Sequence, residues 1–167
     1  MLCFINIGLN TGLRVSDLLE LKFEDLNDNR ILRIIEIKTQ KIKLIKFNTI
    51  CVNSFEMLKK YYIKKGIPAE EFLFKSLNRE FIKKRIFKKI SYSGIKKYFT
   101  LLKNELKLEY PIGTHSLRKT FGKRIYENES DLGLVMKLLN HSSEGVTLRY
   151  IGIDDELIIK CYDNLII

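Results

Sequence analysis

The sequence has little cysteine and no long apolar run. Only three cysteines occur in 167 residues, at Cys3, Cys51 and Cys161. They have no C-x-x-C spacing and too few histidines near them for a zinc site, which is typical of reduced core residues and of a cytoplasmic protein. No apolar stretch approaches the roughly 20 residues of a membrane span, and no signal peptide with a cleavage site is visible. We therefore expect a soluble cytoplasmic protein with no membrane partner.

Several catalytic signatures are also missing from the chain. The sequence holds no P-loop, no G-x-G-x-x-G and no H-E-x-x-H, so nucleotide hydrolysis and zinc chemistry have no support. We accordingly expect no cofactor and no metal.

A length of 167 residues with 46% hydrophobic content allows one domain with a real core, and neither a repeat nor a linker divides it.

Positive charge is concentrated in the middle of the chain. The formal net charge is +10 and the sequence pI is about 9.5. Residues 75–124 carry 15 basic and 3 acidic side chains, whereas residues 125–167 carry 3 and 8. Such a distribution favours a polyanionic partner. Lysine bias also keeps proteins soluble, so charge alone leaves nucleic acid binding open.

Apolar spacing predicts a mainly helical chain with one β-hairpin. Residues 30–47, RILRIIEIKTQKIKLIKF, are rich in isoleucine and partly alternating, and residues 38–41 separate two runs typical of strands. A third short strand at residues 23–26 can precede them. Helical spacing predicts further helices over 48–65, from 91 or 93 to 106, from 114, over 132–139, and around residue 150.

The last segment of the chain is acidic and then apolar. Its apolar residues are spaced for one buried face, namely Leu157, Ile158, Cys161 and Leu165. This face can dock on its own domain or on a neighbouring molecule.

The most informative stretch covers residues 114–150 and holds both histidines of the chain. His115 and Arg118 are three residues apart, so on a helix they share one face and suit a phosphate. Unbroken helix from His141 to Tyr150 would hold these two residues roughly 13.5 Å apart along the axis. Joint action therefore requires the chain to turn at residues 142–145, which are Ser-Ser-Glu-Gly. Tyr150 can then face the same anion.

The order of these motifs, H-x-x-R, then L-L-x-H-S-S, then T-x-x-Y, resembles the tyrosine recombinase family of phage and transposon integrases. The stretch TGLRVSDLLEL resembles the family's box around its first catalytic arginine, which is Arg14 here. In that box an acidic residue three positions on, here Asp17, helps to orient the guanidinium. The resemblance extends from about residue 9 to residue 151.

A lysine on the family's hairpin turn enters the active site, and K-T followed by a second basic residue resembles that turn. Lys38 is the match, while Lys41 and Lys43 remain open alternatives. Two positions depart from the family pattern. Asn140 stands where the family usually has glycine before the histidine, and Lys119 stands where histidine is common. Neither departure removes a catalytic group.

The resemblance implies an α+β, mainly α, catalytic domain with a small antiparallel sheet, of the DNA breaking and rejoining type. It would span residues 1–167 as an N-terminally truncated domain that lacks the separate DNA-clamping domain of the family. Its activity would be site-specific DNA recombination through a covalent 3′-phosphotyrosine intermediate on Tyr150.

The resemblance also implies a role for each matching residue. Arg14 and Arg118 would grip the non-bridging phosphate oxygens, as two guanidiniums can do in bidentate fashion. Lys38 would be the proton donor, His115 the acid-base partner, and His141 a hydrogen-bond donor in the transition state. The partners would be double-stranded DNA and further copies of the protein in a tetrameric synapse. Basic residues expected on the DNA surface are Lys83, Lys84, Arg85, Lys88, Lys89, Lys96 and Lys119.

Other interpretations stay open at this point. Singly, each of these residues is as well explained by a structural role: His115 by a helix cap, His141 by a helix C-terminus, and Arg14 by a pair with Asp17 or Glu20. A type IB topoisomerase would share the same site. A catalytically inactive DNA-binding regulator, or a basic helical module for RNA, would also explain the charge.

Overall fold

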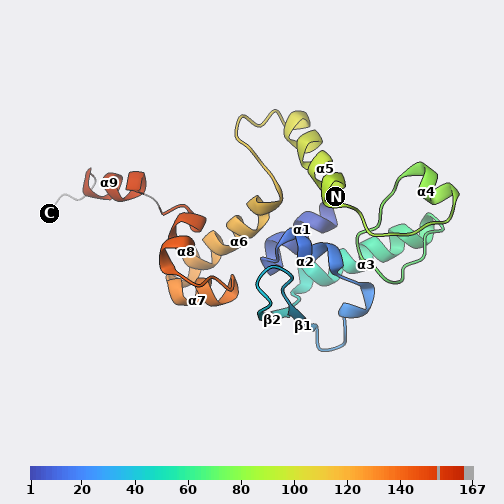
Figure 1. Ribbon diagram of the computed structural model, residues 1–167, viewed down its shortest axis with the longest axis horizontal. Coiled ribbons are helices and arrows are strands. Elements are labelled where there is room, and N and C mark those ends of the chain that lie inside the picture. The colour runs from blue at the N-terminus through green and yellow to red at the C-terminus, as the bar shows by residue number, and fades with distance from the viewer. Residues whose placement is uncertain (154, 164–167) are drawn as a thin grey trace.

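A computed structural model describes residues 1–153 and 155–163 and shows an elongated, mainly helical molecule (Figure 1). Within these residues the helices accompany a single two-stranded sheet. The elements in chain order are α1 (Leu2–Thr11), α2 (Val15–Glu20), the 3-10 helix η1 (Phe23–Asp25), β1 (Ile31–Ile35), β2 (Ile42–Lys46), α3 (Thr49–Lys64), α4 (Arg79–Lys83), α5 (Tyr92–Glu105), α6 (Thr114–Glu129), α7 (Leu132–Leu138), α8 (Glu144–Ile151) and α9 (Asp155–Asp163).

Helix α1 forms the centre of the main apolar core and packs against α3 and α6. Its buried residues include Phe4 and Ile7, which are 2% and 0% exposed. The ring of Phe4 meets Phe74 edge-on at 5.0 Å between centroids and Phe99 at 6.4 Å. Such aromatic pairs add specific geometry to the burial of apolar area. The core therefore holds α1 rigidly between elements from both halves of the chain.

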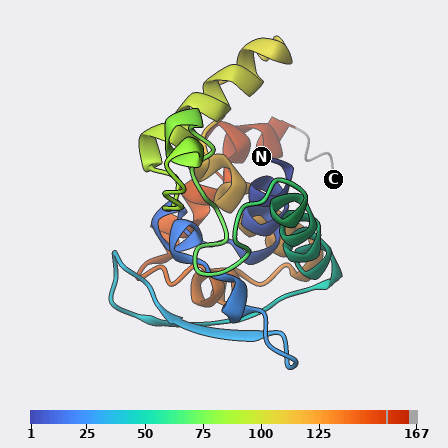
Figure 2. The ribbon, with the colours of Figure 1, turned by 90° about the vertical axis from the view of Figure 1, so that its right-hand side faces the viewer.

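The predicted hairpin is confirmed and lies along one side of α1 and α2 (Figure 2). Strands β1 and β2 pair antiparallel, with Leu32 opposite Ile45. Both of these side chains are buried, while Ile35 and Leu44 on the outer face are more than half exposed. This alternation is what a strand of period two produces when one face covers a core.

The expected third strand at residues 23–26 was wrong, because this segment forms η1. The Asp25 carboxylate accepts the backbone N–H of Lys22 at 2.8 Å and closes a tight turn. Lys22 itself forms an isolated bridge with Phe72, in the apolar segment that follows α3. A local side-chain hydrogen bond thus outweighs the strand preference of Phe23.

A second apolar cluster joins α6, α7 and α8. Val135, Leu139 and Ile151 are buried in it. Between α7 and α8 the chain turns at residues 140–143, and the Ser143 hydroxyl accepts the N–H of Val146 at 3.4 Å to cap α8. This turn allows His141 and Tyr150 to act together, but it lies earlier than the predicted residues 142–145, because Glu144 and Gly145 already belong to α8.

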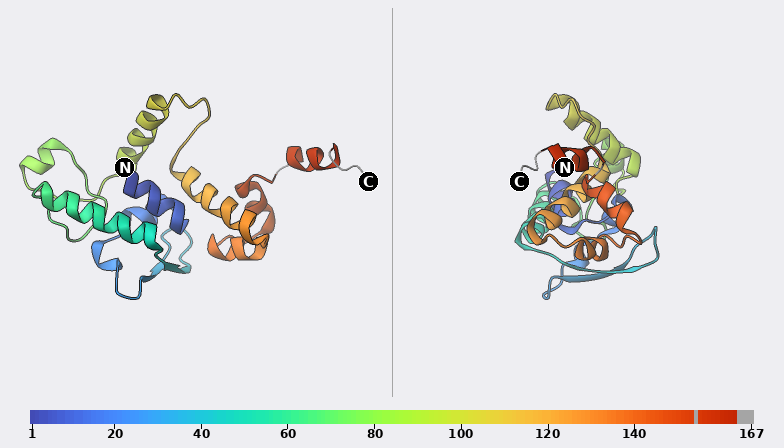
Figure 3. Two further views of the ribbon diagram at one scale, coloured as in Figure 1. Left: turned by 180° about the vertical axis from the view of Figure 1, so that it is seen from behind. Right: turned by 90° about the vertical axis from the view of Figure 1, so that its left-hand side faces the viewer.

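The lysine-rich segment, residues 78–90, contains only one short helix. Only Arg79–Lys83 is helical, and Arg85 has a left-handed backbone with φ 52°. Lys83, Lys84, Arg85, Lys88 and Lys96 are exposed. Lys88 also lies over the Phe81 ring at 4.3 Å, and Lys89 is partly buried and pairs with Glu20. Helices α4 and α7 lie on opposite sides of α1 (Figure 3). The basic segment is therefore set apart from the α6–α8 unit.

Helix α9 extends away from the rest of the domain (Figures 1 and 3). Leu157 is 42% exposed and Ile159 is 61% exposed. The side chains of Ile158 and Cys161, and Leu165 as a whole, lie outside the described residues, so the predicted buried face is not described there. Across the described part of the chain, every helix is too short or too polar to cross a membrane.

Gly12 ends α1 in a left-handed conformation with φ 59°, and a Cβ there would lie 2.3 Å from Cδ1 of Phe121. Gly66 has a similar φ of 65° but nothing within 4 Å of a Cβ.

We expect Gly66→Ala to lower the free energy of unfolding by about 1–2 kcal/mol through backbone strain alone. Gly12→Ala should lose about 1–3 kcal/mol more through overpacking. Urea unfolding of both variants measures the difference, and equal losses would contradict the close approach of Phe121.

Candidate active site

Two arginines that are distant in the sequence meet at one buried carboxylate. Arg14 directly precedes the first residue of α2, and its Nη1 lies 2.6 Å from Glu36 Oε2. Arg118 lies in the second turn of α6, and its Nη1 is 3.4 Å from Glu36 Oε1. Glu36 follows β1 and is 0% exposed. We call Arg14, Glu36 and Arg118 the arginine cluster.

Arg118 is almost fully buried, with 2% of its surface exposed. A buried guanidinium is costly unless its N–H groups are satisfied. Here Nη1 donates to the carbonyl of Gly12 at 2.7 Å, and Nη2 donates to the carbonyl of Leu139. These carbonyls lie at the C-terminal ends of α1 and α7. Helices leave acceptors unpaired at this end and favour positive charge there.

Lys43 is the lysine that the structure places beside the cluster. It is 6% exposed, and its Nζ donates to the carbonyls of Thr11 at 3.1 Å and Gly12 at 3.3 Å. Burial, followed by the nearby charge of Arg118, lowers the pKa of Lys43 to about 8. Lys38 is exposed in the turn between β1 and β2, next to Thr39, whose hydroxyl donates to Glu36 at 2.8 Å. The role of Lys38 stays a prediction.

His141 and Tyr150 lie side by side, as the turn before α8 allows. Their ring centroids are 5.0 Å apart and their planes are almost perpendicular. His141 Nδ1 is 3.1 Å from the hydroxyl of Thr147, and this hydroxyl donates to the carbonyl of Ser143. The hydroxyl proton is therefore committed elsewhere, so Nδ1–H of His141 is the donor.

Burial and the two arginines of the arginine cluster shift the pKa values of both His141 and Tyr150. Burial, and then the charges of Arg118 and Arg14, lower the pKa of His141 to about 4. Burial raises the pKa of Tyr150, and Arg118 and Arg14 partly oppose this rise. Lys119 Nζ lies 5.6 Å from the Tyr150 ring centroid. A neutral imidazole and a protonated phenol thus lie next to two guanidiniums.

His115 does not share the environment of Arg118. It lies in the first turn of α6 and is exposed, although Arg118 one turn later is buried. The structure therefore groups Arg14, Arg118, His141 and Tyr150, and leaves His115 at the edge of this group. Its acid-base role stays a prediction.

Asp17 contacts the hairpin. Its Oδ1 accepts the backbone N–H of Ile37 at 2.9 Å, and its Oδ2 has no hydrogen-bond partner among the described residues. Burial raises the pKa of Asp17, although this hydrogen bond and Arg14 oppose the change. Asp17 thereby ties α2, which Arg14 caps, to the segment that holds Glu36.

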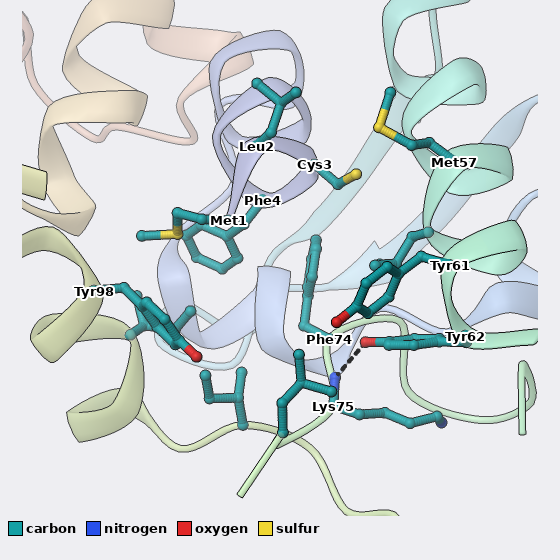
Figure 4. Close-up of a pocket in the computed structure, with 14 residues that line it drawn as sticks. Met1, Leu2, Cys3, Phe4, Met57, Tyr61, Tyr62, Phe74, Lys75 and Tyr98 are labelled. Carbon is teal, nitrogen blue, oxygen red and sulfur yellow. Dashed lines mark hydrogen bonds between the residues drawn. The ribbon is translucent and has the colours of Figure 1, made fainter. Parts of the chain in front are cut away.

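An apolar pocket of about 370 Å³ lies near the opposite end of α1 (Figure 4). Leu2, Cys3, Met57, Tyr61 and Tyr98 are among its lining residues, and Lys75 borders it. The Tyr62 hydroxyl accepts the backbone N–H of Lys75 there at 3.0 Å. The Nζ of Lys75 is bound to the carbonyls of Glu70 and Phe72, so the arginine cluster is the better candidate for phosphate chemistry.

Residues 1–156 match the model of the phage integrase family. The chain belongs to this family. It is 34% identical over 157 residues to the probable integrase/recombinase YoeC of Bacillus subtilis, covering 93% of this chain and 78% of that protein.

Solved structures show the same fold. The crystal structure of XerA recombinase has a TM-score of 0.72 at 21% identity, over 96% of this chain and 56% of that one. XerH site-specific recombinase bound to a palindromic difH substrate has a TM-score of 0.69 at 21% identity, over 97% of this chain and 44% of that one. The chain thus spans about half the length of these two proteins.

Sequence reasoning missed Glu36 as the centre of the cluster. A signal was present, because Glu36 is the only acidic residue in residues 30–47 and stands between isoleucines. A carboxylate inside an apolar strand pattern needs a partner. Thr147 was likewise not singled out, although it is the threonine of the T-x-x-Y motif.

We expect the His141 ring to titrate with a midpoint near its folded pKa of about 4, far below its reference value of 6.5. Between these pH values the unfolded chain binds more protons than the folded one. The His141 contribution to stability is therefore complete above about pH 6.5 and is lost as the pH falls toward 4. Ring-proton NMR measures the midpoint, and His115→Gln assigns the signals. Urea unfolding against pH should fall less steeply in His141→Gln, and identical slopes would contradict the shift.

Proposed function

We propose that this chain is the catalytic domain of a site-specific DNA recombinase that cleaves and rejoins strands through Tyr150. The observation that carries the proposal is the grouping of Tyr150, His141 and Arg118. Arg14 belongs to this group because it binds the same Glu36 carboxylate as Arg118. Two guanidiniums suit a phosphodiester because each offers planar, paired donors to two oxygens. Family membership supports the same activity.

In the proposed reaction, the Tyr150 oxygen attacks a phosphorus of the DNA backbone. A new O–P bond forms as the bond from phosphorus to the 5′ oxygen of the next nucleotide breaks. This gives a 3′-phosphotyrosine and a free 5′-hydroxyl, and attack by a 5′-hydroxyl reverses the step. Arg14 and Arg118 stabilise the charge that develops on the non-bridging oxygens.

Two proton transfers accompany this exchange. The phenol must lose a proton, since burial raises its pKa, and the leaving oxygen must gain one. An anionic phosphate next to His141 favours the imidazolium and raises the pKa of that ring. His141 then donates a hydrogen bond to the phosphate in the transition state. We propose Lys38 as the donor to the leaving oxygen and His115 as the acid-base partner.

The proposed partner is double-stranded DNA. XerH, which shares the fold, is described in complex with a palindromic difH substrate. Residues 75–124 of this chain supply the excess of positive charge for phosphate contacts. We also propose a cytoplasmic location and self-association on DNA into a tetrameric synapse, in keeping with the resemblance.

Tyr150→Phe should abolish covalent attachment to DNA, because phenylalanine lacks the attacking oxygen. A randomised pool of nicked duplexes removes the need to know the target sequence, since loss of the short strand traps the adduct. Denaturing gels then detect DNA that remains attached to the protein. Tyr110→Phe, at a tyrosine that is 62% exposed, is the control and should behave as wild type.

Each other result of this assay has a meaning. An adduct that persists in Tyr150→Phe would contradict the assignment of the nucleophile. DNA binding without any adduct in the wild type would favour an inactive regulator. Adducts at all sequences, together with relaxation of supercoiled DNA, would favour a type IB topoisomerase.

The identity of the proton donor can be tested with a DNA whose leaving 5′ oxygen is replaced by sulfur, because a thiolate leaves without protonation. We expect Lys38→Ala to slow cleavage of ordinary DNA by about 10²–10⁴-fold. The sulfur substrate should restore the cleavage rate of this variant. Lys43→Ala should be slow on both substrates if Lys43 only supports the carbonyls of Thr11 and Gly12. Restoration of Lys43→Ala and not of Lys38→Ala would assign the role to Lys43.

A further inference from the structure

Glu36 contacts four segments around the candidate active site through one carboxylate. Its Oε1 lies 3.4 Å from Arg118 Nη1, and its Oε2 lies 2.6 Å from Arg14 Nη1. The same Oε2 accepts the hydroxyl of Thr39 at 2.8 Å and the amide of Asn140 at 3.0 Å. Thr39 follows Lys38 in the chain, and Asn140 precedes His141. The carboxylate therefore joins α2, α6, the hairpin turn and the turn before α8.

We propose that Glu36 is a positioning residue that holds Arg14 and Arg118 as one preformed phosphate clamp. This inference rests on the proposed function, whose reaction needs both guanidiniums at one phosphate. Free arginine side chains have many rotamers, and ordering them when DNA binds would cost free energy. A buried carboxylate that orders them beforehand removes this cost from the reaction.

The exposure of these side chains shows that Glu36 supports the clamp from behind. Glu36 has 0% of its side chain exposed, whereas Arg14 keeps 14% exposed and Arg118 keeps 2%. A carboxylate that occupied the phosphate position would itself face solvent. Arg118 uses Nη1 for Gly12 and Glu36 and one Nη2 proton for Leu139. A guanidinium has five N–H donors, so two are not used by these acceptors, and Arg118 also forms a side-chain hydrogen bond with Tyr150.

The carboxylate is held in its charged form. Burial alone would raise the pKa of Glu36, but hydrogen bonds from Asn140 and Thr39 and the contact with Arg14 outweigh burial and lower it. Glu36 therefore stays ionised at neutral pH. Its charge also reduces the repulsion between two guanidiniums that would otherwise be buried close together.

Asn140 explains a departure from the family pattern. Its backbone φ is 50°, a left-handed conformation that glycine adopts freely and asparagine tolerates. Unlike glycine, asparagine has an amide, which donates to Glu36 and lies 3.4 Å from the carbonyl of Ile42. In this chain, Asn140 thus couples the residue before His141 to the carboxylate that holds both arginines.

The first test is Glu36→Gln, which keeps the size of the side chain but points an amide N–H₂ or a neutral oxygen at the guanidiniums. We expect the cleavage rate of bound DNA to fall by about 10²-fold while the affinity for DNA does not fall. Glu36→Asp keeps the charge but is one methylene shorter, so it should not restore the rate. Glu127→Gln, which removes a surface partner of Lys123 on α6, is the matched control and should cleave as wild type.

Asn140→Gly provides a variant that the backbone accommodates. Loss of one hydrogen bond to Glu36 should slow cleavage about fivefold and leave the urea unfolding midpoint close to that of the wild type. An unchanged rate in Glu36→Gln would overturn the proposal. A faster rate would show instead that Glu36 competes with phosphate, and full activity in Glu36→Asp would show that only charge matters.

A second measurement separates this inference from the proposed function. Guanidinium N–H signals in NMR exchange slowly with water when the group is fixed in hydrogen bonds, and Arg14→Lys and Arg118→Lys assign them. We expect slow exchange for both arginines in the wild type and faster exchange for both in Glu36→Gln. If the wild type forms no adduct with DNA, this result still decides whether Glu36 positions the clamp, and equal exchange rates would overturn it.

Discussion

The structure depends on the burial of one guanidinium. Arg118 is 2% exposed, so its N–H groups need acceptors inside the protein. It finds them at Gly12 after α1, at Glu36 after β1 and at Leu139 after α7. Two of these acceptors are carbonyls at helix C-termini, where positive charge is favoured. A single side chain thus links three separate segments, and Lys43 at Gly12 and Arg14 at Glu36 share two of these acceptors with it.

This arrangement also sets the electrostatics of the site. Arg14, Lys43 and Arg118 face one buried carboxylate, so the local charge is positive before any substrate binds. The depressed pKa values of Lys43 and His141 are consequences of burial beside these cations. An anion that enters the site stabilises each of these charges and raises both pKa values. The charge of the site thus supports the proposed phosphodiester substrate.

Local patterns in the sequence predicted most helices well, because these helices have clear apolar spacing and caps. The helix at residues 49–64 and the helix that begins at Thr114 match their predicted ranges closely. The segment at residues 23–25 did not follow its strand preference, since the Asp25 carboxylate closes a turn there. In the basic stretch at residues 78–90, for which the sequence predicted no element, a short helix covers Arg79–Lys83.

The motif residues could be named from the sequence, since their order and spacing are local properties of the chain. Their grouping could not, because it depends on which side chains face inward once α1, the hairpin and α6 have packed. His115 and Arg118 illustrate this limit: they share a helix, yet one is exposed and the other is buried. Lys43 and Lys38 illustrate it again, because strand register turns Lys43 toward Gly12. The sequence by itself determined the family, most of the elements and the set of candidate residues. Only the tertiary structure decided that Glu36 lies between Arg14 and Arg118. A carboxylate can be buried only where cations and hydrogen-bond donors surround it, and distant segments supply these here.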